Sequence, residues 1–164
     1  MSSAPRMEFN GLWPTWLVTR RLPGFEAPNA GLAAHIVALE ARETDLTVRF
    51  HEQRFFSSAN SHVRWLKNEI EQTATAFLRQ VGVKQEPTWA LMGWCNTNRY
   101  GDHHAPHTHP RAYLSGTYYV RVPPPPDEVE DPRARPGCIS FYDPRTAANM
   151  VTVGTEYDAR LPTE

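Results

Sequence analysis

Four of the chain's seven histidines lie in the segment from Gly101 to Pro110. Neutral imidazole is the side chain that most often binds divalent transition metals in proteins. His107 and His109 are two positions apart, and alternate residues of an extended segment project from the same side of the backbone. The two side chains could therefore bind one metal ion together. A solvated histidine-rich loop and an adventitious metal site are the alternative interpretations.

The composition limits the classes of protein to consider. The chain has 164 residues, which is enough for one domain with a substantial core. A formal net charge of -1 argues against a surface that binds nucleic acid. We find neither an apolar run of membrane-spanning length nor the apolar stretch of a secretory signal, so we expect no membrane partner and a cytoplasmic location. Cys95 and Cys138 are expected to be reduced thiols in the core.

Apolar spacing predicts two amphipathic helices, at about residues 30–42 and 61–81. Asn29 is a suitable cap for the first helix, and Gly82 is placed to end the second. Short strand-like segments lie at 13–19 and 47–50, and the main strands are predicted within residues 88–164, at 88–96, 113–122 and 137–142. Strands joined by loops favour a sheet or barrel with helices outside. The predicted fold class is mainly β with flanking α-helices, as a single domain over residues 1–164.

Several separated motifs follow one another in the second half of the chain. They read Trp94-x-Asn96, Gly101, His107-x-His109-Pro110, Leu114-Ser-Gly-x-Tyr-Tyr-Val120 and Gly137-x-Ile-x-Phe-x-Asp143-Pro-Arg145. In this order they resemble the 2-oxoglutarate/Fe(II)-dependent oxygenases, in a bacterial and phage branch of that superfamily. The resemblance runs over most of residues 13–145. The step of six positions from Gly101 to His107 is also similar to the prolyl-hydroxylase pattern.

The resemblance implies a double-stranded β-helix, which is a jelly-roll or cupin-like barrel with iron at its open end. It also implies oxidative decarboxylation of the co-substrate 2-oxoglutarate, coupled to hydroxylation of a C–H bond. His107 matches the first histidine ligand of the family. His109 stands where most members have an aspartate or glutamate, and Asp102 is an alternative carboxylate ligand. We therefore predict His107 and His109 as the metal ligands and catalytic residues for Fe(II).

The distal histidine ligand of the family has no counterpart, because no histidine follows His109. In the family a basic residue that pairs with the far carboxylate of 2-oxoglutarate comes after that histidine. We expect either that a longer chain supplies both, so that the barrel is incomplete at its C-terminus, or that the protein has lost part of the site. An incomplete sheet would expose an apolar edge, which a homodimer would cover.

Four further residues are predicted to bind the cofactors. Asn96 and Asn98 share one face of a strand before the histidines, where they would orient the keto acid or a metal-bound water, or else cap the strand. Tyr119 would donate to a cofactor carboxylate or else pack as an ordinary aromatic residue. Arg145 would anchor an anionic group, although Asp143 offers it a simple ion pair.

Three functions are consistent with these residues. The first is an Fe(II)- and 2-oxoglutarate-dependent dioxygenase that hydroxylates a small molecule or a peptide side chain. The second is a cupin-like metal or small-ligand binding protein without redox activity. The third is a three-histidine dioxygenase that is independent of 2-oxoglutarate. Pocket-lining loops are the least readable part of a sequence, so no individual substrate is predicted.

Overall fold

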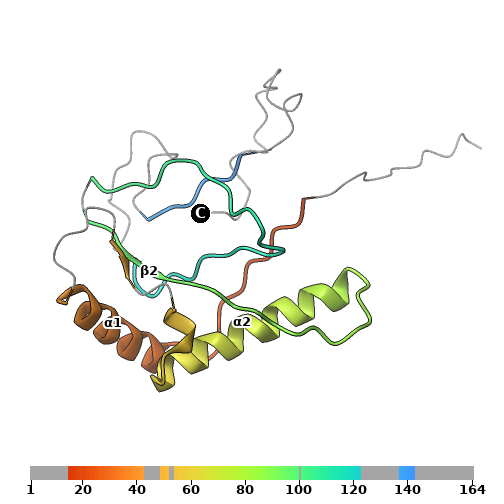
Figure 1. Cartoon of the computed structure of the whole chain (residues 1–164), viewed down its shortest axis with the longest axis horizontal. Helices are drawn as coiled ribbons and strands as arrows, with labels where there is room; N and C mark the ends of the chain where they lie inside the picture. The colour runs from red at the N-terminus through yellow and green to blue at the C-terminus, as the bar shows by residue number, and fades with distance from the viewer. Residues whose placement is uncertain (1–14, 43–48, 52–53, 100, 123–136, 143–164) are drawn as a thin grey trace, which may run out of the picture. The chain divides into compact units, whose positions relative to one another are not determined.

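The computed structural model describes residues 15–42, 49–51, 54–99, 101–122 and 137–142. Its elements are, in chain order, α1 (Glu26–Glu40), β1 (Arg49–His51), the 3₁₀ helix η1 (Phe55–Ser57), α2 (Ser61–Gln80) and β2 (Cys95–Thr97). The chain divides into two compact units, Met1–Thr117 and Tyr118–Glu164, and all five elements belong to the first (Figure 1). The single domain expected from the sequence stays a prediction.

Local signals begin and end α2, the longest helix. The side-chain oxygen of Asn60 accepts hydrogen bonds from the backbone N–H groups two and three residues further on, at 2.8 and 3.4 Å. At the other end, Gly82 has a φ of 93°, and the N–H of Val83 donates to the carbonyl of Leu78 at 2.9 Å. A glycine in the left-handed region is the usual way to close a helix with such a bond. The structure thus has α2 where the sequence predicts the second helix.

Replacing Asn60 by alanine is expected to lower the free energy of unfolding by about 1 kcal/mol, because two N–H groups lose their acceptor. Equilibrium denaturation in urea, followed by the far-ultraviolet circular dichroism of the helices, measures this change. Asn60→Asp is the matched control, since it keeps the accepting oxygen and should stay close to the unsubstituted chain. Equal losses in the two variants would contradict a capping role.

The first helix begins earlier than the sequence predicts. α1 starts at Glu26, and the N–H of Asn29 donates to the carbonyl of Phe25 at 2.8 Å. Asn29 therefore lies inside the helix, and the prediction that it caps the helix is wrong. The reason is Pro28, which is tolerated in a first turn because the N–H it lacks would have no helical acceptor there.

The core lies where the two helices meet. α1 packs against α2, and Leu32 and Val63 are fully buried. Gly31 allows a close approach, because a Cβ atom there would come within 2.1 Å of the ring of His62. The strands β1 and β2 pair in antiparallel register, and both contact α1 (Figure 1). α1 thereby holds β2, and the chain continues from β2 to the histidines.

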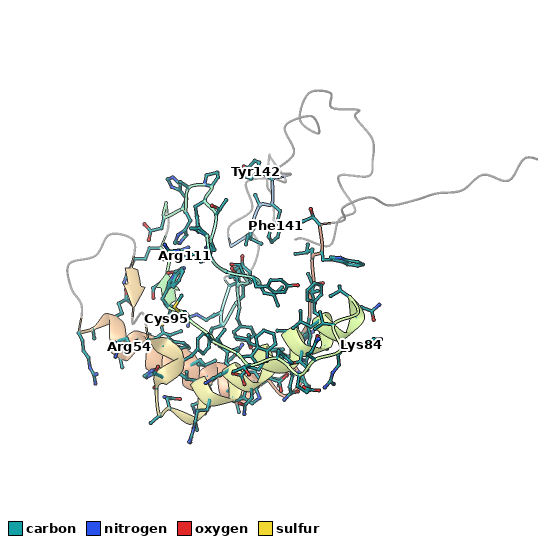
Figure 2. All side chains as sticks on the ribbon, turned by 45° about the vertical axis from the view of Figure 1, so that its right-hand side comes forward. Arg54, Lys84, Cys95, Arg111, Phe141 and Tyr142 are labelled. Carbon is teal, nitrogen blue, oxygen red and sulfur yellow. The ribbon has the colours of Figure 1, made fainter. Side chains whose placement is uncertain are left out.

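The predicted fold class is wrong for the described residues. These contain two α-helices, one 3₁₀ helix and a two-stranded sheet of three-residue strands, with no jelly-roll or double-stranded β-helix. Among the described residues, 113–122 and 137–142 take part in no strand pairing. Three of their aromatic side chains are largely exposed, those of Tyr113, Phe141 and Tyr142, and Figure 2 labels the last two. Alternating apolar residues favour an extended chain. A strand also needs a partner brought in from a distance, and the alternation does not specify that partner.

The N-terminal strand prediction is also not observed where it can be checked. Residues 15–19 of the predicted strand 13–19 pair with no other strand, and the remainder lies outside the described residues. A polar contact holds this segment instead. The guanidinium of Arg20 pairs with Glu69 at 2.9 Å and donates to the hydroxyl of Thr73 at 2.7 Å, both on α2. At Arg20 the segment is therefore held against α2 and not against a sheet edge.

The two cysteines are free thiols in different surroundings. Cys95 is buried on β2, where Figure 2 labels it, and Cys138 is exposed in the second unit. The expectation of a core thiol is therefore correct for Cys95 and wrong for Cys138. The difference follows from the missing strand, because residues 137–142 do not bury a face.

No helix in the part of the chain that the structure describes is long and apolar enough to cross a membrane. α2 has 20 residues, but an ion pair between Lys67 and Glu71 lies along it. A bilayer-spanning helix needs about 20 predominantly apolar residues.

Candidate metal centre

A tight turn starts the histidine loop, by which we mean residues 101–110. The backbone N–H of Asp102 donates to the carbonyl of Arg99 at 3.0 Å, and its carboxylate accepts the N–H of Arg99 at 2.8 Å. Gly101 has a φ of 88°, which costs glycine little. The guanidinium of Arg99 also pairs with Glu40, the last residue of α1. The loop is therefore tied to the helix layer at its first residues.

A second contact folds the loop back toward the sheet. The ring Nε2 of His104 lies 3.1 Å from the side-chain oxygen of Asn98, which directly follows β2. An amide oxygen only accepts hydrogen bonds, so Nε2 of His104 carries the proton in this contact. The contact fixes the orientation of the Asn98 amide.

His107 and His109 present their ring nitrogens to each other. Their Nε2 atoms are 3.0 Å apart, the ring centroids are 5.0 Å apart, and the two ring planes differ in orientation by 22°. Two imidazole nitrogens that bind one ion at about 2.1 Å and at a right angle to each other are about 3.0 Å apart. The pair thus has the separation that two neighbouring ligands of one ion require.

The other ring nitrogen of His107 fixes its proton. Nδ1 of His107 lies 2.8 Å from the backbone carbonyl oxygen of Ala105. A carbonyl oxygen can only accept, so Nδ1 carries the proton and Nε2 keeps its lone pair. Histidine ligands of metals usually donate their second N–H in this way. His107 is therefore held in the tautomer that a metal ligand needs.

A reverse turn follows His109. The N–H of Ala112 donates to the carbonyl of His109 at 3.3 Å, and the two central residues are Pro110 and Arg111. Arg111, labelled in Figure 2, has a φ of 70°. This is the pattern of a type II turn, in which glycine or asparagine usually takes the position of Arg111. The strained residue reverses the chain directly after a proposed ligand, and its backbone conformation costs about 1–3 kcal/mol.

Two residues beside the reversed chain contact the His109 ring. The hydroxyl of Ser115 lies 3.1 Å from its Nδ1. The indole of Trp94, the residue before β2, stacks on it with centroids 5.7 Å apart at 25°. Neither residue was predicted to belong to the site. Both stand in the motifs that carry the family resemblance, so a signal for them exists in the sequence.

The structure places the four predicted cofactor-binding residues differently. Asn96 is exposed on β2, and Asn98 is exposed and bonded to His104, both in the unit that holds the histidine loop. Tyr119 belongs to the second unit. Arg145 lies outside the described residues. All four assignments stay predictions.

Tyr119 keeps its phenolic proton. Partial burial raises the pKa of its hydroxyl above the ordinary value, and the charge of an ionised Cys138 thiol acts in the same direction. A phenol with a raised pKa remains a hydrogen-bond donor at neutral pH. Tyr119 therefore has the chemistry to donate to a carboxylate.

The described residues contain no group of three His, Cys, Asp or Glu side chains that could hold a metal ion. Asp102, the alternative carboxylate ligand, accepts the backbone N–H of Arg99 within its own turn. Within these ranges, the two facing imidazoles are a candidate ligand pair without a third His, Cys, Asp or Glu beside them.

Comparison with known proteins agrees with this chemistry. Residues 92–164 match the family described as putative 2OG-Fe(II) oxygenase. That family implies Fe(II) as cofactor and 2-oxoglutarate as co-substrate. The match begins just before β2 and includes both facing histidines, so the resemblance found in the motifs is confirmed over these residues. No curated protein and no solved structure matches the chain.

Proposed function

We propose that this chain, whose residues 92–164 match the 2OG-Fe(II) oxygenase family, is an Fe(II)- and 2-oxoglutarate-dependent dioxygenase. In this proposal it hydroxylates a small molecule or a peptide side chain, and His107 and His109 hold the iron. The observation that carries the proposal is the 3.0 Å separation of the two Nε2 atoms, together with the Nδ1 contact that leaves a lone pair on Nε2 of His107. The family match supports the class of reaction.

Each residue has a definite task in this proposal. When bound, Fe(II) supplies open coordination positions for the keto acid and dioxygen. Asn96 and Asn98 offer amide groups to the keto acid from the strand end before the loop. Tyr119 offers a protonated phenol to a carboxylate, which its raised pKa supports. Arg145 pairs with an anionic group of the co-substrate or substrate.

The charge of the ligands sets how firmly they hold iron. Two neutral imidazoles attract a divalent cation less strongly than a pair that includes a carboxylate, because no negative charge offsets that of the ion. The keto acid itself brings that charge. We therefore expect 2-oxoglutarate and Fe(II) to bind cooperatively, each raising the affinity for the other by the same factor.

The test uses the full chain under anaerobic conditions. Binding of 2-oxoglutarate is measured by calorimetry with and without stoichiometric Fe(II), and succinate is then measured after air is admitted. We expect 2-oxoglutarate to bind only in the presence of iron and succinate to form only when both are present. Iron-loaded protein that neither binds 2-oxoglutarate nor forms succinate would refute the dioxygenase.

One observation favours a second function. Both histidines are exposed, as expected for a metal-binding protein without redox activity. Such a protein would bind about one Zn²⁺ or Ni²⁺ per chain and show no affinity for 2-oxoglutarate. Oxygen consumption without 2-oxoglutarate would instead indicate a dioxygenase that needs no co-substrate.

A further inference from the structure

We propose that Ser115 is a positioning residue that directs Nε2 of His109 toward the metal ion. The proposal rests on the function proposed above, in which His107 and His109 are the ligands. Its basis is the contact between the hydroxyl of Ser115 and Nδ1 of His109, at 3.1 Å. Ser115 touches neither iron nor substrate in this role and acts through the imidazole alone.

The two histidines differ in what their Nδ1 atoms face. Nδ1 of His107 faces a carbonyl oxygen, which fixes the proton on that nitrogen. Nδ1 of His109 faces a hydroxyl, which can either donate or accept. His109 can therefore exist as either neutral tautomer without losing this hydrogen bond, whereas His107 cannot.

This difference matches the contact between the two rings. Nε2 of His107 has a lone pair, so the 3.0 Å contact is a hydrogen bond only when Nε2 of His109 carries a proton. The hydroxyl of Ser115 then donates to Nδ1 of His109. An ion that binds both rings needs both Nε2 lone pairs. The proton of His109 must then be on Nδ1, and the rotated hydroxyl of Ser115 accepts it. One serine thus serves the protein with and without metal.

The surroundings of His109 restrict its ring to this arrangement. Trp94 stacks on the ring, and the turn through Arg111, whose φ is 70°, brings the chain back toward Ser115. A hydroxyl that meets Nδ1 leaves Nε2 to face His107. Removal of the hydroxyl leaves the Nδ1 proton without its protein acceptor, and loss of such a partner typically weakens metal binding by about 10- to 100-fold.

Metal affinity of the full chain tests the proposal at one fixed pH. Co²⁺ is the probe, its binding is measured by calorimetry, and quenching of tryptophan fluorescence gives a second signal because Trp94 stacks on His109. Ser115→Ala is expected to weaken Co²⁺ binding by about tenfold. This is the lower end of the 10- to 100-fold range given above, because the site is exposed. Ser115→Thr keeps a hydroxyl and is expected to restore the affinity. Thr117→Ala, which removes a hydroxyl from the same segment, is the matched control and should leave it unchanged.

A spectroscopic measurement separates positioning from a general loss of structure. Long-range ¹H–¹⁵N correlation spectra report which imidazole nitrogen carries the proton. We expect Nε2–H on His109 in the metal-free chain and Nδ1–H in the chain loaded with Zn²⁺. In the metal-free chain, Ser115→Ala should reduce the preference of the His109 proton for Nε2. The circular dichroism of the helices should stay unchanged.

The outcomes separate this proposal from the one on which it rests. If His109→Ala lowers Co²⁺ affinity and Ser115→Ala does not, Ser115 has no positioning role and the ligand assignment stands. If neither His107→Ala nor His109→Ala lowers it, the ligand assignment itself is wrong. A loss in Ser115→Ala that Ser115→Thr does not restore would also overturn the positioning role.

Discussion

Replacing His107 by alanine is expected to weaken divalent-metal binding by at least about 100-fold and to abolish succinate formation. The variant leaves one imidazole where two faced each other at 3.0 Å, so the proposed chelation is lost. Removal of a residue that only hydrogen-bonds to a metal ligand already lowers metal affinity by about 10- to 100-fold. Loss of a ligand itself should lower the affinity further. Calorimetry with Co²⁺ and an assay of succinate measure the two effects.

His103→Ala is the matched control for this prediction. His103 is an exposed histidine of the same loop and lies four positions before His107. Its removal lowers the number of histidines by the same amount but leaves the facing pair intact. If both variants lost metal affinity to the same extent, the loop would be binding metal through any of its histidines, and the specific pair would be refuted.

Replacing Leu32 by alanine is expected to lower the free energy of unfolding by about 3 kcal/mol. Leu32 is fully buried on α1, which packs against α2. Truncation removes buried apolar surface and leaves a cavity that the two helices can close only in part. Equilibrium denaturation in urea measures the loss.

Val37→Ala on the same helix supplies the comparison. Val37 is 61% exposed, so its truncation should change the stability by less than about 0.5 kcal/mol. The contrast depends on burial alone, because both substitutions place an alanine inside α1. Equal effects from the two variants would show that α1 does not pack as the structure has it.

The helices could be predicted from the sequence because their signals are local. The cap at Asn60 and the terminating glycine at position 82 lie within a few residues of the ends of α2. The start of α1 was missed because Pro28 looks like an interruption and is in fact part of the first turn. Local signals thus gave the presence of the helices more reliably than their ends.

The observed strands, Arg49–His51 and Cys95–Thr97, overlap only the ends of the predicted strands at 47–50 and 88–96. Strand bounds were missed because strand pairing is not a local property. Residues 95–97 form a strand because residues 49–51, far away in the sequence, pair with them across the sheet. Residues 113–122 alternate between apolar and polar side chains equally well but have no such partner among the described residues. A pattern of period two therefore indicated where the chain could extend, and the fold class drawn from it was wrong.

The candidate site was predictable only in part. The spacing of His107 and His109 places both rings on one side of the chain, and the structure brings them together. The contacts of Trp94 and Ser115 with His109 depend on a turn that has arginine at its left-handed position. No sequence rule favours arginine at the left-handed position of such a turn. The chain reversal at Arg111 could therefore not be predicted.

Under the proposed function, the exposure of the two facing histidines affects which metal ion they bind. Nitrogen donors bind Ni²⁺ and Cu²⁺ more tightly than Fe²⁺, and neither shape nor charge of a surface pair excludes the competitors. Chromatography on immobilised nickel should therefore retain the untagged protein and leave some of it loaded with the wrong metal. Under the same proposal, iron would occupy the site through supply during synthesis. We therefore expect activity in preparations that are stripped with a chelator and reconstituted with Fe(II) without oxygen.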